Sequence, residues 1–389
     1  MNKPLLPSGL KYALDTVWKA ARKRQRLLIS LLKYGLGIAL LGYVLWHDWS
    51  PPASGGLGLR DILAKPLQVG PLLLTAFIFL IGALLTFVRW YVLVRAQELP
   101  FTPVNALRLG LLGFYFSAFL PTSIGGDIIK AAFLAREQSR RTVAVATVLL
   151  DRAIGLWGII WIVSVLGSAL WLGGHETVQE RLSLHFIVLT AVVVLGVTIS
   201  LWLLLGILPE WRAQRFASRL ERYLPIVGNA AAEFWRAVWM YRSKGLSIAG
   251  ALLISIGSQT CFVFAFFFAS HVFHDPDQPP HAPSLVEHFL LVPIGTGIQA
   301  VYPSPGGIGG GEWGFGKLFS LVDPSMETTG TFACLVLRVI TLGLGLTGYL
   351  VYLRMRPVRP PVAATDEKPV AELQLSGMQQ VAGSSDASG

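Results

Sequence analysis

The sequence predicts an all-α polytopic membrane protein with about six full transmembrane helices and two re-entrant hairpins in an inverted-topology repeat, a total also countable as eight helices. Of its 389 residues, 53% are hydrophobic and 14% are charged, against about 25% charged in an ordinary soluble domain. Six apolar runs reach the roughly 20 residues that a helix needs to cross a bilayer. Two shorter runs end in Pro/Gly-rich segments, at 119–127 and 302–312.

The six predicted spans cover residues 27–46, 69–93, 143–172, 184–208, 246–272 and 331–353. The first has a basic flank like that of a signal peptide, but it is too long and has no A-x-A cleavage site, so an uncleaved span is expected. The segments 105–120 and 285–301 are shorter and run straight into the Pro/Gly motifs. Irregular backbone inside a membrane needs protein or a water-filled cavity around it, so these segments predict re-entrant halves beside a binding site.

Basic residues give the predicted orientation in the cell (inner or plasma) membrane. Residues 1–26, 209–245 and 354–359 are rich in Lys and Arg, which places both termini in the cytoplasm. Both flanks of the first short segment are also basic, so it enters and leaves from the cytoplasmic side. The loops 47–68, 173–183 and 273–284 are poor in Lys and Arg, which puts the second short segment on the outer side. The halves 27–172 and 184–353 are therefore predicted to be inverted copies.

Three parts of the chain are predicted: a basic cytoplasmic N-terminus (1–26), a transmembrane domain (27–355) and a disordered cytoplasmic tail (356–389) rich in Pro, Ala and Ser. The segment 209–245 mixes tryptophans with arginines and is expected to lie along the cytoplasmic interface. Arg89, near the cytoplasmic end of its span, is expected to be an interface anchor.

The two halves also repeat short motifs. Pro121-Thr122 recurs as Pro303-Ser304, and the sequence IGGD at 124–127 recurs as IGGGE at 308–312. The span that follows carries an intramembrane arginine in each half, Arg152 and Arg338. The shared order of these three features supports the repeat.

The Pro/Gly segments have two interpretations. A helix that starts inside the membrane presents backbone N–H groups and the positive end of its dipole, which attract an anion. Gly125 and Gly126 precede a helix near Asp127, and the glycines of 306–311 precede one near Glu312. A phosphate or carboxylate is then held between the two helix starts. Alternatively, the glycines only allow tight packing between half-helices.

Intramembrane charge also has two interpretations. Asp151 and Arg152 lie about eight residues, on the order of 12 Å, inside a span, where charge usually faces a bundle interior or cavity. In one interpretation, Asp127 or Asp151 neutralises Arg152 or Lys130 in fixed structural pairs. In the other, Lys130, Arg152 and Arg338 form a cationic path for a lipid phosphate, with the acidic residues as counter-ions or proton carriers. Ser258 and Gln259 are expected to make interhelical hydrogen bonds or to contact a ligand.

The predicted substrate-binding residues combine these motifs and charges: Pro121, Thr122, Gly125, Gly126, Asp127, Lys130, Asp151, Arg152, Pro303, Ser304, Gly306, Gly307, Glu312 and Arg338. No catalytic residue, metal or other cofactor is predicted. The seven histidines are scattered, no zincin, P-loop or G-x-S-x-G motif is present, and Cys261 and Cys334 lie in apolar runs as core fillers. The net charge of +10 is spread beside apolar runs, which argues against a nucleic-acid partner.

Three segments carry a resemblance to a known family: FLPTSIGGD at 119–127, LLDRAIGL at 149–156 and PSPGGIG at 303–309. Over roughly 30–355 the sequence resembles the flippase-like transmembrane family named for the transmembrane region of lysylphosphatidylglycerol synthase. The resemblance implies an inner-membrane protein that moves an aminoacylated phospholipid or another lipid-linked anion between leaflets. The bifunctional synthases continue into a soluble aminoacyl-transferase domain that this sequence does not show, so that activity is not carried over. Gly311 also stands where members often have Arg before the Glu.

Three functions follow as hypotheses. The first is a lipid flippase whose partner is a membrane lipid with an anionic head group. The second is a membrane-embedded transferase or hydrolase that acts on a lipid phosphate with Asp127 or Asp151 as base. The third is an accessory subunit of envelope lipid synthesis, with a soluble lipid-modifying enzyme as partner.

Overall fold

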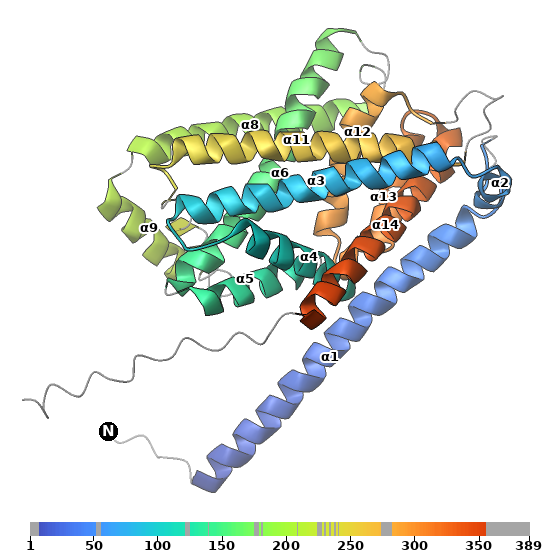
Figure 1. The fold of residues 1–389 in the computed structure, drawn as a ribbon. Coiled ribbons are helices and arrows are strands. Elements are labelled where there is room, and N and C mark those ends of the chain that lie inside the picture. Colours follow the sequence, from blue (N-terminus) through green and yellow to red (C-terminus); the bar gives the residue numbers. More distant parts are fainter. Residues whose placement is uncertain are drawn as a thin grey trace, which may run out of the picture.

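The computed structural model describes residues 8–51, 56–120, 125–138, 140–174, 179, 182–207, 209–223, 228, 231–232, 235–236, 239, 241–273 and 282–354. In these residues it has twelve α-helices, two short 3-10 helices and no strand (Figure 1). Six helices are long and apolar enough to cross a membrane: α1 (Ser8–His47), α3 (Val69–Ala96), α6 (Arg141–Leu172), α8 (Leu182–Ile207), α11 (Gly245–Ala269) and α14 (Glu327–Arg354). The all-α polytopic membrane fold is thus confirmed.

The first helix is longer than its apolar run. α1 spans 40 residues, of which only Leu28–His47 have the hydropathy of a membrane span. Residues 8–27, most of the predicted basic N-terminus, continue the same helix. In Figure 1, α1 (blue) runs along the outside of the bundle, and its N-terminal half lies away from the other helices. The short helix α2 (Leu59–Ala64) follows it.

Both predicted hairpins consist of two half-helices with a break between them. The first is α4 (Pro103–Phe119) and α5 (Gly125–Glu137), and the second is α12 (Leu285–Val301) and α13 (Gly310–Ser320). Local sequence explains their starts, because Thr102 and Ser284 accept backbone N–H groups at the beginning of α4 and α12.

The second break contains η1 (Pro305–Gly307), and Gly306, Gly307 and Gly309 have φ of 56°, 69° and 83°. Such left-handed backbone favours glycine. A second short helix, η2 (Pro324–Met326), leads from α13 into α14.

The corresponding spans α3 and α11 run in opposite directions, as an inverted repeat requires. Gly82 of α3 packs against Phe262 of α11, whereas Arg89 of α3 contacts Ser255 of α11. Residue numbers therefore rise along α3 while they fall along α11, so these equivalent spans run antiparallel. Near the ends of the pair, Gln68 N–H donates to the Val272 carbonyl at 2.7 Å, which agrees with the same direction. This arrangement agrees with the predicted inverted repeat.

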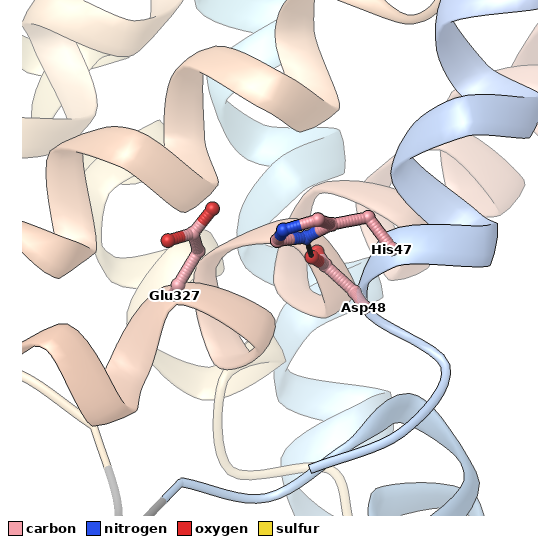
Figure 2. A group of neighbouring side chains, drawn as sticks. All are labelled: His47, Asp48 and Glu327. Carbon is pink, nitrogen blue, oxygen red and sulfur yellow. Dashed lines mark hydrogen bonds and ion pairs between the residues drawn. The ribbon is translucent and has the colours of Figure 1, made fainter. Parts of the chain in front are cut away.

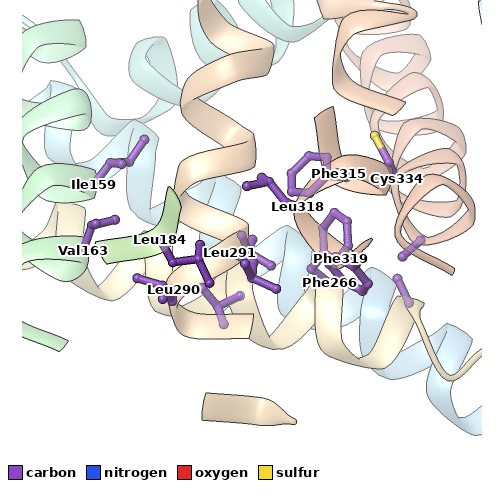
Figure 3. Close-up of a cluster of buried hydrophobic side chains, with 14 of the residues drawn as sticks. Ile159, Val163, Leu184, Phe266, Leu290, Leu291, Phe315, Leu318, Phe319 and Cys334 are labelled. Atoms are coloured by element: carbon purple, nitrogen blue, oxygen red, sulfur yellow. The ribbon is translucent and has the colours of Figure 1, made fainter. Parts of the chain in front are cut away.

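A large apolar cluster joins both halves (Figure 3). It combines residues of α6 and α8 with residues of α11 to α14, and includes Ile159, Val163, Leu184, Phe266, Leu290, Leu291, Phe315, Leu318, Phe319 and Cys334.

The helix α8 is apolar on all sides, and its outer surface leaves Phe186 57% and Leu203 63% exposed. A helix that is hydrophobic all round suits a lipid environment.

The helix α9 (Glu210–Tyr223) covers the start of the predicted interfacial segment and is amphipathic. Trp211 is exposed, and the guanidinium groups of Arg212 and Arg215 lie 4.9 and 4.8 Å from its ring centroid. This composition favours a membrane surface, and the location of α9 there stays a prediction. The predicted disordered tail, 356–389, lies outside the described residues.

Candidate functional site

A cavity of about 410 Å³ lies between the two halves of the bundle. Its walls come from α3, α4, α5 and α6 of the first half and from α11, α12, α13 and α14 of the second. Both broken helices contribute, through Asp127 and Lys130 of α5 and through Gly306 in the second break. The volume lies within the range of about 300–1,000 Å³ that is typical of small-molecule sites. Six charged side chains line it: Arg89, Asp127, Lys130, Asp151, Arg152 and Arg338.

Asp127 organises the charges of the first half. It is the third residue of α5, so its carboxylate lies at the positive end of the helix dipole. Its Oδ1 is 2.9 Å from Lys130 Nζ, and its Oδ2 accepts a hydrogen bond of 2.8 Å from Arg152 Nη1. Arg152 also donates to the Ala300 carbonyl of α12, at 3.4 Å, and thereby connects the halves. Asp127 thus forms the fixed pairs with Lys130 and Arg152 that the first interpretation predicts.

Asp151 has a different partner, which sequence reasoning missed. Arg89 Nε donates to Asp151 Oδ1 at 2.7 Å, and Arg89 Nη1 donates to Ser255 Oγ at 3.0 Å. Arg89 is only 6% exposed, so its expected role as an interface anchor is wrong. One signal could have found the pair: an intramembrane carboxylate needs a cation nearby, and Arg152 next to it points elsewhere.

Glu312 has the equivalent place in the second half. It is the third residue of α13 and is fully buried. Its Oε2 accepts the Gly309 N–H at 2.8 Å, and its Oε1 accepts a hydrogen bond from Arg338 Nε. Arg338 also donates to the carbonyls of Gly306 and Gly307, at 3.1 and 3.4 Å. This network holds the second break in place, and it uses the Gly309 N–H that the sequence had suggested for an anionic ligand.

The repeat extends to these pairs. Arg152 is the twelfth residue of α6, and Arg338 is the twelfth residue of α14. In each half an acid at the third position of the re-entrant helix thus binds an arginine at the twelfth position of the next span.

The charges around the cavity do not cancel. Among the described residues, four basic side chains (Arg89, Lys130, Arg152 and Arg338) meet three acidic ones (Asp127, Asp151 and Glu312). One formal positive charge is left, because Asp127 serves both Lys130 and Arg152. Lys130 Nζ also lies 5.5 Å from the centroid of the Trp90 ring. A low-dielectric cavity with one excess positive charge favours an anion.

Most of the motif glycines serve packing. A Cβ on Gly126 would lie 2.0 Å from the Gly113 carbonyl oxygen, and one on Gly310 would lie 2.1 Å from the Tyr302 ring. Gly309 lies against the backbone of α1, where its Cβ would be 2.7 Å from the Gly37 oxygen. Tight packing, the alternative interpretation, is therefore confirmed at these positions. Gly306 differs, since it lines the cavity.

We expect Gly126→Ala to lower the free energy of unfolding by about 1–3 kcal/mol, because the added methyl group meets backbone that has little room to move. Gly250→Ala in α11 is the control, since its Cβ has no atom within 4 Å, and alanine there is expected to be neutral or to stabilise by up to about 1 kcal/mol. Thermal unfolding of both variants in detergent measures the difference. Equal effects would contradict this account of Gly126.

The structure separates the predicted site residues into groups. Asp127, Lys130, Asp151, Arg152, Gly306 and Arg338 line the cavity, whereas Gly125, Gly126, Pro303, Ser304, Gly307 and Glu312 do not. Ser304 is buried and donates to the Ile308 carbonyl at 2.7 Å within the second break. Pro121 and Thr122 lie outside the described residues. Gln259 lines the cavity, while Ser258 donates to the Ser255 carbonyl of its own helix.

One group of potential metal ligands occurs in the part of the chain that the structure describes: His47, Asp48 and Glu327, with donor atoms within 4.8 Å of one another (Figure 2). Each already has a protein partner. Asp48 contacts His47 Nδ1 at 2.8 Å and accepts from Thr331 Oγ1 at 2.8 Å, and Glu327 pairs with Lys317 at 2.5 Å. These contacts connect the end of α1 to the start of α14.

Comparison with known proteins agrees with this architecture. Residues 28–348 match the model of the family described as the lysylphosphatidylglycerol synthase TM region. No curated protein and no solved structure matches the chain. The match covers most of the chain, including five candidate spans in full, most of the sixth and both broken helices, so the protein belongs to the family of the lysylphosphatidylglycerol synthase transmembrane region, a membrane domain linked to lipid metabolism.

Proposed function

We propose that the protein moves an anionic phospholipid or a lipid-linked phosphate between the leaflets of the cell membrane. The observation that carries this proposal is the cavity between the inverted halves, with one positive charge in excess. A charge inside a membrane protein is costly unless it is paired or serves a ligand. The excess cation gives the negative head group a place in the bundle that the hydrocarbon of the bilayer does not offer.

The size of the cavity supports a head group as its occupant. About 410 Å³ is near the lower end of small-molecule sites, so a head group and the first part of the hydrocarbon chains fit, while the rest of the chains extend toward the bilayer. Rocking of one half against the other would then open the cavity to each side in turn, as in other inverted-repeat transporters.

Transport is favoured over chemistry on the lipid phosphate because both candidate bases are already engaged. Asp127 is paired with Lys130 and Arg152, and Asp151 is paired with Arg89. A general base must be able to accept a proton from the attacking group, and both carboxylates already accept hydrogen bonds from cationic side chains. A soluble lipid-modifying enzyme would then be a partner that supplies or uses the lipid.

We also propose that both termini lie in the cytoplasm. The support is the distribution of Lys and Arg in residues 1–26, 209–245 and 354–359. In this orientation, the first break is reached from the cytoplasmic side and the second from the outer side.

Reconstitution tests the proposal. Vesicles of phosphatidylcholine with a little fluorescent phosphatidylglycerol are prepared with and without the protein, and a membrane-impermeant quencher then measures how fast the probe changes leaflets. We expect faster exchange with the protein, and unchanged lipid masses in a parallel mass-spectrometric analysis. Exchange equal to that of empty vesicles would overturn transport of this lipid class, and a new lipid mass would favour the enzymatic alternative.

A further inference from the structure

The inverted repeat allows the two walls of the cavity to be compared position by position. α5 and α13 both begin with two glycines and an acid, so Lys130 and Phe315 are equivalent as the sixth residues of their helices. Asp151 and Leu337 are equivalent in the same way, because each directly precedes the arginine at the twelfth position of its span.

The contacts between α3 and α11 give a third equivalent pair. Arg89 lies against Ser255, and Phe262 lies against Gly82. In both helices the large residue lies seven positions after the small one. A two-fold axis between the helices therefore exchanges Arg89 with Phe262.

All six of these residues line the cavity. Where the first half has Arg89, Lys130 and Asp151, the second half has Phe262, Phe315 and Leu337. Asp127 and Arg152 of the first half and Arg338 of the second half also line the cavity, together with uncharged residues from both halves. The first half therefore contributes five charged side chains to the lining and the second half one. We call the first three residues the charged wall and the other three the apolar wall.

The apolar wall is part of the packed core. Phe315 is 2% exposed, and its ring centroid lies 4.3 Å from that of Phe266 (Figure 3). The charged wall is equally fixed, because Arg89 and Asp151 form a buried pair. Neither wall can take on the character of the other by a simple side-chain rotation.

We infer that the substrate is an amphipathic lipid that binds in one orientation. Its anionic head group lies against the charged wall, and the first part of its hydrocarbon chains lies along the apolar wall. The physical reason is that a charged head group loses solvation against aromatic and aliphatic side chains, whereas hydrocarbon gains from contact with them. This inference rests on the proposed function. It adds that the two halves, although related by the repeat, contact different parts of the lipid.

Photolabelling tests the orientation. The full chain is reconstituted in phosphatidylcholine vesicles with one of two phosphatidylglycerol probes, which carry a diazirine on the head-group glycerol or near the start of one acyl chain. Mass spectrometry of peptides measures the label at Phe262, Phe315 and Leu337 relative to the label at Arg89, Lys130 and Asp151. Val339, which is 70% exposed on α14, reports labelling by surrounding lipid. Excess unmodified phosphatidylglycerol should displace label from the cavity but not from Val339.

We expect this ratio to be about tenfold higher for the acyl probe than for the head-group probe. A tenfold ratio corresponds to a free-energy difference of RT ln 10 between the two orientations. Labelling of both walls at equal ratios, or in the reverse order, would overturn the inferred orientation. Failure of both probes to label the cavity above the Val339 background would instead overturn lipid binding in the cavity, and with it the proposed function.

Two variants sharpen the test. Lys130→Met removes a charge from the charged wall, so the labelling ratios measured with the acyl probe and with the head-group probe should become more similar. Phe315→Leu keeps the apolar wall apolar, so the tenfold difference should persist. Unchanged ratios in a folded Lys130→Met variant would contradict the role of the charged wall.

Discussion

Replacing Lys130 with methionine should slow the exchange of anionic lipid between leaflets at least about tenfold. Four basic and three acidic side chains surround the cavity, so the loss of one cation leaves no excess charge for the head group. At an effective dielectric constant of about 20, opposite charges 4 Å apart attract by about 4 kcal/mol. Only about 1.4 kcal/mol of that attraction must be lost for a tenfold effect.

Lys130→Met should leave the fold intact, because Asp127 keeps its 2.8 Å contact with Arg152. Lys317→Met is the matched control. Lys317 pairs with Glu327 outside the cavity, and its loss should leave exchange unchanged. The measurement is the rate of leaflet exchange of fluorescent phosphatidylglycerol in reconstituted vesicles. If both variants slow exchange equally, or if neither does, the excess charge of the cavity is not what recruits the lipid.

Glu312→Gln should lower the free energy of unfolding by about 3–5 kcal/mol, the cost of leaving a buried charge without its partner. Glu312 is fully buried and binds both Arg338 and the Gly309 N–H through its two oxygens. A glutamine has one acceptor oxygen, so it can keep only one of these contacts, and Arg338 keeps its charge. Chemical unfolding in detergent, followed by tryptophan fluorescence, measures the loss.

The same substitution at Glu327 is the control for Glu312. Its partner Lys317 is 46% exposed, so Glu327→Gln should cost no more than about 1 kcal/mol. A second comparison isolates the pair. If Arg338→Met is added to Glu312→Gln, the unpaired cation is removed, and a coupling of about 1–3 kcal/mol is expected. Additive losses would show that Glu312 acts through the Gly309 N–H alone.

Much of the fold followed from local patterns. Apolar length predicted the spans well, as in the match of 69–93 to α3 and of 143–172 to α6. Pro and Gly marked both helix breaks, because the preference of such backbone for these residues is a local property. The same reasoning underestimated α1, since residues 8–27 are too polar to span a membrane and yet continue its helix.

The partners of the charges were decided by the tertiary structure. Arg89 and Asp151 are 62 residues apart, and Arg338 meets Glu312 across 26 residues. No local pattern assigns such pairs, because an intramembrane carboxylate accepts whichever cation the packing of the helices brings near. In the structure, Asp151 pairs with Arg89 rather than with its neighbour Arg152, and Asp127 pairs with two cations.

The sequence by itself therefore determined the class of molecule, its spans, its two breaks and the inverted order of its halves, because hydropathy, helix-breaking residues and charge asymmetry act over short stretches of chain. Only the tertiary structure decided what the halves share between them: a cavity with one excess positive charge and with one charged and one apolar wall. These properties depend on distances between helices, and those distances follow from packing over the whole bundle.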